Sequence, residues 1–264
     1  MVGASFALAQ ADREGRPTRV SLMARQCLVL FPVIFCLNIL AACGKPTPPP
    51  LSPTEILSRS ATRMKALSSF HFVIDRSGAP AFLDPAGTLA FRRAEGEYAA
   101  PDRARATVRV IAPGLVAEVK IVCIGKDYWE TDLLTGEWLA LPPDMGFNPA
   151  VLFDPATGLP PILETDVSDV ELAGIEELRE LPGKKLYSLR GVLNGERLYV
   201  MSYGLIGPER VSVQLWVAPE TFDLYRAVII EPATPGSDKT TWQVDFWDLG
   251  KQVDIQLPPN PKKP

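Results

Sequence analysis

The chain has 264 residues, of which 47% are hydrophobic and 22% are charged, and its formal net charge is −4. This composition supplies enough apolar side chains for a substantial core and excludes an intrinsically disordered chain. The basic residues are scattered, so we expect no nucleic-acid partner. Zinc sites and catalytic triads usually draw on more than the single histidine present here, His71. We therefore predict no catalytic residues, no metal site and no cofactor.

Residues 1–42 predict a secretory signal peptide. Residues 16–25 are basic without an acidic residue, and an apolar segment, residues 27–40, follows. That order, ending in small residues, is typical of a signal peptide. The apolar segment is shorter than the roughly 20 residues that a membrane-spanning helix needs. A start at Met23 would give a more typical short basic segment than a start at Met1, and the sequence leaves both open.

The signal segment ends in Leu40-Ala41-Ala42-Cys43, which resembles the lipobox of bacterial lipoproteins. In lipoproteins the cysteine receives a diacylglycerol and becomes the new N-terminus after cleavage. The resemblance therefore implies lipidation at Cys43 and a protein anchored by lipid at the extracytoplasmic side of the cell membrane. The alternative is an ordinary secreted protein cut after Ala42. Residues 43–51 are rich in proline and predict an extended tether, which leaves residues 52–264 as the folded domain.

The first element predicted in that domain is a helix that begins at Ser52. The segment Ser52-Pro53-Thr54-Glu55 is a capping box with proline at the first helical position. Apolar residues then recur at helical spacing and predict one buried stripe. The members of this stripe are Ile56, Leu57, Ala61, Met64 and Leu67. Ser68 and Ser69 end the helix.

Most of the remaining sequence alternates between apolar and polar residues, which predicts strands. The predicted strands are residues 70–75, 87–91, 106–110, 115–124, 128–130, 138–140, 169–173, 187–192, 211–217, 225–231 and 242–246. Thr135-Gly136 is the expected turn of a hairpin. Two short helical segments, residues 148–153 and 159–163, interrupt the strands and are expected to form a lid or plug. Residues 258–264 are expected to be a loose tail.

These elements predict an α+β domain built on one long antiparallel sheet that is apolar on one face. A sheet of that size curls, and the few helices are expected to cover its concave face. The concavity of such a sheet is a common place for a ligand cavity. We see neither a second domain nor an internal repeat.

Segments throughout residues 52–264 resemble the LppX/LprA/LprF/LprG group of mycobacterial-type lipoproteins. The resembling segments are Met64 to Phe72, Pro101-Asp102-Arg103, Ile124 to Trp129, Thr135 to Trp138, Phe153-Asp154-Pro155, Val213 to Val217 and Val253 to Ile255. The resemblance implies a curved half-barrel sheet related in shape to the LolA and LolB carriers, with a large apolar cavity beneath its helices. It also implies a lipid or glycolipid ligand, whose identity the differing loops 77–85 and 194–208 leave open, and an envelope transporter as a further partner.

Apolar positions on the predicted strand faces and short helices are the candidates for the wall of this cavity. They are Phe72, Ile74, Val108, Val110, Val119, Ile121, Leu152, Leu159, Leu163, Val213, Leu215, Val228 and Ile230. Each one by itself is better explained by core packing, and only the whole set, placed on the fold that the resemblance implies, favours a cavity. An acyl chain gains ~0.8 kcal/mol per buried methylene, which would suffice to retain a lipid.

The expected function is therefore to bind the acyl chains of a lipid or glycolipid and to carry or present that lipid at the outer face of the cytoplasmic membrane. A sensor or scaffold that binds a protein partner is the alternative. A hydrolase is disfavoured because the sequence has no Gly-x-Ser-x-Gly motif. Cys123 is expected to be an inert buried thiol, and Glu176, Glu177 and Glu180 are expected to form a solvated acidic patch.

Overall fold

The structure, a computed structural model, describes residues 51–142, 148–233 and 238–262. The predicted signal peptide and lipidated Cys43 lie outside the described residues, as does the tether up to Pro50. The chain from Leu51 onward forms one compact unit. Among the described helices, none is long and apolar enough to span a membrane.

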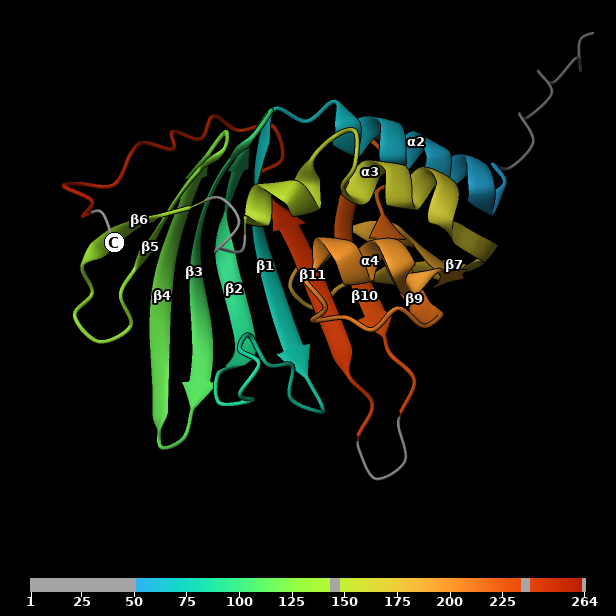
Figure 1. Cartoon of the computed structure of the whole chain (residues 1–264). Coiled ribbons are helices and arrows are strands. Elements are labelled where there is room, and N and C mark those ends of the chain that lie inside the picture. Colours follow the sequence, from blue (N-terminus) through green and yellow to red (C-terminus); the bar gives the residue numbers. More distant parts are fainter. Residues whose placement is uncertain (1–50, 143–147, 234–237, 263–264) are drawn as a thin grey trace, which may run out of the picture. The chain divides into compact units, whose positions relative to one another are not determined.

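One antiparallel sheet of eleven strands dominates this unit (Figure 1). The strands are β1 (Ser69–Ser77), β2 (Ala90–Ala99), β3 (Arg103–Ala112), β4 (Leu115–Ile124), β5 (Asp127–Thr131), β6 (Trp138–Leu141), β7 (Val167–Glu177), β8 (Lys185–Leu193), β9 (Val211–Val217), β10 (Leu224–Ile230) and β11 (Thr241–Trp247). Their order is β6-β5-β4-β3-β2-β1-β11-β10-β9-β8-β7. The first and last strands are thus neighbours in the middle, while β6 and β7 form the open edges.

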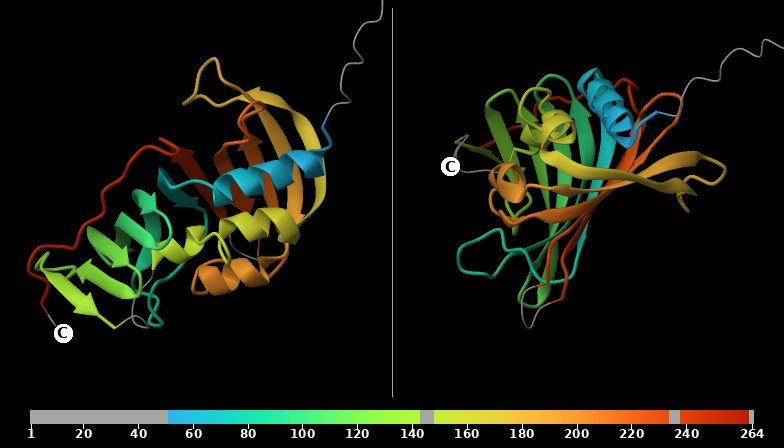
Figure 2. Two further views of the ribbon diagram at one scale, coloured as in Figure 1. Left: turned by 90° about the horizontal axis from the view of Figure 1, so that it is seen from above. Right: turned by 90° about the vertical axis from the view of Figure 1, so that its right-hand side faces the viewer.

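The helical segments gather on one face of the curved sheet (Figure 2). They are α2 (Pro53–Lys65), the 3₁₀ helix η2 (Pro149–Phe153), α3 (Leu159–Pro161), the π-helical turn η3 (Ile162–Asp166) and α4 (Gly195–Met201). We call the covered side of the sheet the inner face and the opposite side the outer face. The predicted fold class, a half-barrel sheet with one long helix and short helices over it, is confirmed.

The start of α2 follows the sequence prediction in part. The Ser52 hydroxyl accepts a hydrogen bond from the Glu55 amide at 3.2 Å, so the predicted N-cap is present. The Glu55 carboxylate pairs with Arg59 at 2.6 Å, one turn further on, instead of completing the capping box. The predicted apolar stripe of this helix is buried from Ile56 to Leu67.

Alternation along the strands divides the apolar side chains between the two faces of the sheet. Most of them, including Phe70 and Phe72 of β1, join one large core between the inner face and the helices. Two small clusters lie on the outer face. One forms around Trp216, and the other forms where the C-terminal segment places Ile255 against Val122. The helices therefore cover the inner face, where most of the apolar side chains of the sheet must be shielded from water.

Two elements were placed wrongly by sequence. The predicted strand 87–91 is mostly a loop, and the real strand β2 runs from Ala90 to Ala99. A bulge between Phe91 and Arg93 breaks the alternation there, so the sequence pattern does not reveal the strand. The segment 194–208, expected to be a loop, contains α4.

The prediction of a loose C-terminal tail is wrong within the described residues. The backbone of Lys262 pairs with edge strand β6, because its amide donates to the Trp138 carbonyl at 2.8 Å and its carbonyl accepts from the Ala140 amide at 2.7 Å. The Lys262 ammonium also reaches Glu137 at 2.6 Å. The tail thereby covers part of an edge that would otherwise present unpaired backbone groups.

Candidate functional site

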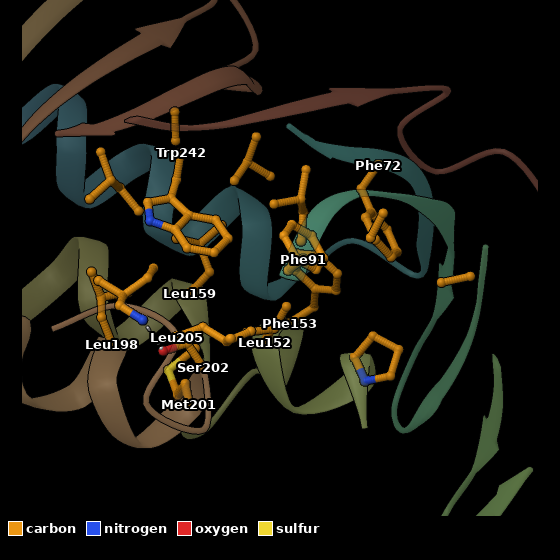
Figure 3. Close-up of a pocket in the computed structure, with 18 of the residues that line it drawn as sticks. Phe72, Phe91, Leu152, Phe153, Leu159, Leu198, Met201, Ser202, Leu205 and Trp242 are labelled. Atoms are coloured by element: carbon orange, nitrogen blue, oxygen red, sulfur yellow. Dashed lines mark hydrogen bonds between the residues drawn. The ribbon is translucent and has the colours of Figure 1, made fainter. Parts of the chain in front are cut away.

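An apolar cavity of about 110 Å³ lies between the inner face of the sheet and the helical layer (Figure 3). Strands β1, β2, β3, β10 and β11 form one wall, and η2, α3, η3, α4 and the loop after α4 form the other. The lining residues are Phe72, Ile74, Phe91, Ala94, Ala106, Val108, Pro149, Leu152, Phe153, Leu159, Ile162, Leu198, Met201, Ser202, Leu205, Ile206, Ala227, Ile229, Trp242 and Val244. Segments far apart in sequence thus meet around one space.

The cavity wall exposes only apolar atoms. Ser202 is the one lining residue with a polar side chain, apart from the indole of Trp242. The Ser202 hydroxyl accepts from the Ile206 amide at 3.0 Å and lies 3.4 Å from the Tyr199 carbonyl. Trp242 directs its indole nitrogen to the Glu231 carboxylate at 2.7 Å. Because both polar groups are occupied within the protein, the wall is suited to hydrocarbon.

Aromatic rings fix the width of the cavity. Phe153 of η2 packs on Phe72 with ring centroids 4.7 Å apart and on Phe70 at 5.1 Å, almost edge to face. Phe91 and Trp242 are 5.4 Å apart on adjoining parts of the sheet wall. Such pairs contribute beyond their buried area, so the contacts of Phe153 hold η2 at a defined distance from the sheet.

Five of the predicted cavity residues line this space: Phe72, Ile74, Val108, Leu152 and Leu159. Others face the same side of the sheet but are packed into the large core without lining the cavity. On the strands these are Val110, Ile121, Val213 and Leu215, with Val119 partly buried against the same core. Leu163 of η3 packs into that core from the helical layer. The cavity occupies only the middle of the inner face, whereas the sequence pattern marks the whole face.

The two residues predicted on β10 do not line the cavity. Val228 packs against the cluster around Trp216 on the outer face, and Ile230 is absent from the wall. Their neighbours Ala227 and Ile229 line the cavity instead. The physical reason is a bulge between Leu224 and Arg226, since one extra residue moves every following side chain to the opposite face.

The contribution of α4 and the loop after it was not expected from the sequence. Leu198 and Met201 of α4, together with Leu205, close the cavity (Figure 3). Ile206 also lines it. The sequence signal for this helix is Asn194, a residue type preferred at helix N-caps. In the structure its side chain accepts a hydrogen bond from the Glu196 amide at 3.3 Å. Leu198 and Met201 lie at the i, i+3 spacing of a buried helical stripe.

The titratable groups singled out by sequence lie away from the cavity. His71 Nδ1 is 3.7 Å from Glu97 on the outer face, and its ring stacks on Trp247. Glu176 accepts a hydrogen bond from the Trp216 indole at 2.9 Å. The described residues contain no cluster of histidine, cysteine and acidic side chains suited to a metal ion.

Cys123 is fully buried on the inner face of β4. Burial raises the pKa of its thiol to about 12, because the thiolate would be desolvated. The predicted burial of Cys123 is thus confirmed. Since the thiolate is the reactive form, the raised pKa agrees with the expectation of an inert thiol, which stays a prediction.

Comparison with known proteins assigns the family. Residues 52–255 match the LppX_LprAFG lipoprotein family, and this match spans most of the chain. The chain therefore belongs to that lipoprotein family, as the sequence segments predicted. A search of curated protein sequences gave no match.

Solved structures support the fold. LprF from Mycobacterium bovis matches with a TM-score of 0.61 at 18% identity, covering 81% of this chain and 99% of that one. Lipoprotein LppX from Mycobacterium tuberculosis matches with a TM-score of 0.54 at 16% identity, covering 77% and 98%. A LolA superfamily protein from Nitrosomonas europaea also matches, at 14% identity over 78% of this chain and 96% of that one, with a TM-score of 0.29. The fold assignment rests on the first two.

Proposed function

We propose that this protein is an envelope lipoprotein that binds acyl chains of a lipid or glycolipid and carries or presents that lipid at the outer face of the cytoplasmic membrane. The acylated Cys43 is its anchor, and the Pro-rich tether holds the domain off the membrane. The observation that supports ligand binding most directly is the cavity between sheet and helices, whose wall exposes only apolar atoms. An apolar cavity of this kind favours hydrocarbon because each buried methylene contributes ~0.8 kcal/mol.

The cavity volume adds a condition to this proposal. An engineered apolar cavity of about 150 Å³ admits benzene, so the 110 Å³ found here holds only the end of an acyl chain. Binding a long chain requires the helical layer to move outward. The short segments α3 and α4, of 3 and 7 residues, are the parts we expect to move, because short helices depend on tertiary packing for their stability.

The ligand can be identified by expressing the full chain with Cys43→Ala in its native host, which removes the protein's own acyl anchor from the result. The exported protein is purified without detergent and extracted with organic solvent, and the extract is analysed by mass spectrometry. We expect one lipid class in stoichiometric amount.

A matched pair of variants on β10 tests whether that lipid occupies the cavity. Ile229→Trp fills the cavity from its wall, whereas Val228→Trp enlarges the neighbouring side chain on the outer face. We expect the first variant to lose the lipid and the second to retain it. A chain that is purified empty and takes up no lipid would sink the proposal and favour a sensor or scaffold.

The predicted anchor is tested separately in cells of the same host. We expect the wild-type chain to incorporate labelled fatty acid and to fractionate with membranes, and Cys43→Ala to do neither. Membrane association that persists in Cys43→Ala without incorporated label would contradict lipidation at this cysteine.

A further inference from the structure

Arg76 is an arginine on the inner face of the sheet, where the strand positions that line the cavity are all apolar. It follows Phe72 and Ile74 along β1 at the alternating spacing that places all three on one face, and those two residues line the cavity. Arg76 is paired in register with Trp242 of β11, which also lines the cavity. Only 5% of Arg76 is exposed.

No hydrogen bond or ion pair of the Arg76 guanidinium is found among the described residues. Its Nε is buried without a partner. The guanidinium carbon lies 5.5 Å from the centre of the Trp242 ring, and this cation–π contact is its one recorded interaction at close range. Buried arginines are normally paired, so the state of this one requires an explanation.

The acidic group that acts on Arg76 is already occupied. Glu231 Oε1 accepts from the Trp242 indole at 2.7 Å, and Glu231 Oε2 accepts from the Gly207 amide at 3.0 Å. Burial lowers the pKa of Arg76, the negative charge of Glu231 raises it, and the positive charge of Arg92 lowers it. Glu231 is thus the carboxylate whose charge favours the Arg76 cation, but no hydrogen bond joins the two groups in the described part of the chain.

A buried cation without a hydrogen-bonded counter-ion costs free energy, and a bound anion would lower that cost. A guanidinium is the side chain best suited to a phosphate or carboxylate, because it presents several donors in one plane. The position of Arg76, next along β1 from two cavity residues, suits a ligand whose tail and anion are joined.

We propose that Arg76 binds the oxyanion of an anionic lipid headgroup, a phosphate in the first instance, while the acyl chain of the same lipid enters the cavity past Trp242. This inference rests on the proposed function and specifies its ligand class. It makes Arg76 the group that distinguishes an anionic lipid from a neutral one with identical chains.

The test uses oleoyl lysophosphatidic acid and monooleoylglycerol, which share one acyl chain and differ by the phosphate. Delipidated Cys43→Ala protein is titrated with each below its micellar concentration by isothermal calorimetry. We expect the phosphate-bearing lipid to bind about tenfold more tightly or better, as is typical of a charge-assisted hydrogen bond in a buried site.

Variants assign this preference to a residue. Arg76→Met is expected to abolish the preference and leave the affinity for monooleoylglycerol unchanged, and Arg76→Lys to keep part of it. Arg93→Met is the matched control, since Arg93 lies on the outer face of β2 and pairs with Asp75 and Glu95. It should retain the full preference. Thermal melting of each variant verifies that it is folded.

Each remaining outcome has a definite meaning. Equal affinities for the two lipids in the wild type, or a preference that survives in Arg76→Met, would overturn the headgroup assignment and leave the proposed function standing. Failure of both lipids to bind would overturn both proposals. Inorganic phosphate that binds as tightly as the lipid, and depends on Arg76, would show a site for free anions instead of a headgroup.

Discussion

The inner and outer faces of the sheet differ in whether their arginine side chains are paired with acidic groups. On the outer face Arg93, Arg105, Arg109 and Arg226 each pair with acidic side chains of the same or neighbouring strands, for example Arg109 with Glu118 at 2.8 Å. On the inner face Arg76 is more deeply buried than any of these and has no such partner among the described residues. These four outer-face arginines are therefore paired within the protein, whereas the inner face has a cavity and a buried arginine without a hydrogen-bonded counter-ion, which suit a ligand.

The largest effect is expected where the helical layer packs onto the inner face. Phe153 of η2 is buried and contacts the rings of Phe70, Phe72 and Phe246. We expect Phe153→Ala to lower the free energy of unfolding by about 3–5 kcal/mol, through lost transfer free energy and the space left behind. Urea denaturation measures this change. Trp247→Ala on the outer face is the control and should cost clearly less. Equal losses would show that the two faces are equally packed.

The next effect concerns the most buried arginine pair of the outer face. The Arg226 side chain is 12% exposed and contacts Asp245, its cross-strand partner, with a second hydrogen bond of 2.9 Å to the same carboxylate. Arg226→Met leaves that carboxylate without its cation. We expect a loss of about 2–3 kcal/mol in the free energy of unfolding, somewhat below the value for fully buried pairs. The double variant Arg226→Met/Asp245→Leu should recover most of the loss, and no recovery would refute a pairing effect.

Cys123 tests how well the inner face excludes water. Burial raises the pKa of its thiol from 9.0 to about 12, so between these values the folded protein holds a proton that the unfolded chain has released. Stability is then present below pH 9 and is lost as the pH rises. From pH 9 to 10 this group should remove about 1 kcal/mol, measured by urea denaturation at each pH.

Tyr98 is the other group whose pKa is raised to about 12, from an ordinary value of 10.0. The range from pH 9 to 10 lies below that ordinary value, so Cys123 dominates the loss of stability there. Cys123→Ala should therefore flatten the loss of stability between pH 9 and 10. Unchanged slopes in the variant and the wild type would mean that water reaches the thiol.

The smallest expected effect on stability is at Arg76 itself. Because the guanidinium makes no hydrogen bond or ion pair with the described residues, Arg76→Met should leave the free energy of unfolding unchanged or raise it by about 1 kcal/mol, as replacement of a buried charge by an apolar side chain often does. The sign is thus opposite to that expected for Arg226→Met. Differential scanning calorimetry without lipid gives the comparison. A loss of more than about 2 kcal/mol would show that Arg76 is stabilised by the protein alone, and would remove the basis of the headgroup assignment.

The sequence by itself determined the class of fold and the family. The Ser52 cap, the apolar stripe of α2 and the alternating strands indicated one curved sheet with helices on one face, because periodicity reports which side of an element is buried. The sequence also marked Phe72 and Val108 as candidates for the cavity wall. These features depend on the spacing of apolar residues within single elements, which can be read directly from the amino-acid sequence.

Only the tertiary structure decided where the cavity ends and which residues face it. The bulge in β10 exchanged Val228 for Ile229, since a single inserted residue reverses the faces without a visible sign in the sequence. The burial of Arg76 beside Trp242 likewise depends on strands that are distant in sequence and meet in the middle of the sheet. Burial and pairing arise from packing between elements, so the sequence could name Arg76 only as one more charged residue at the end of a strand.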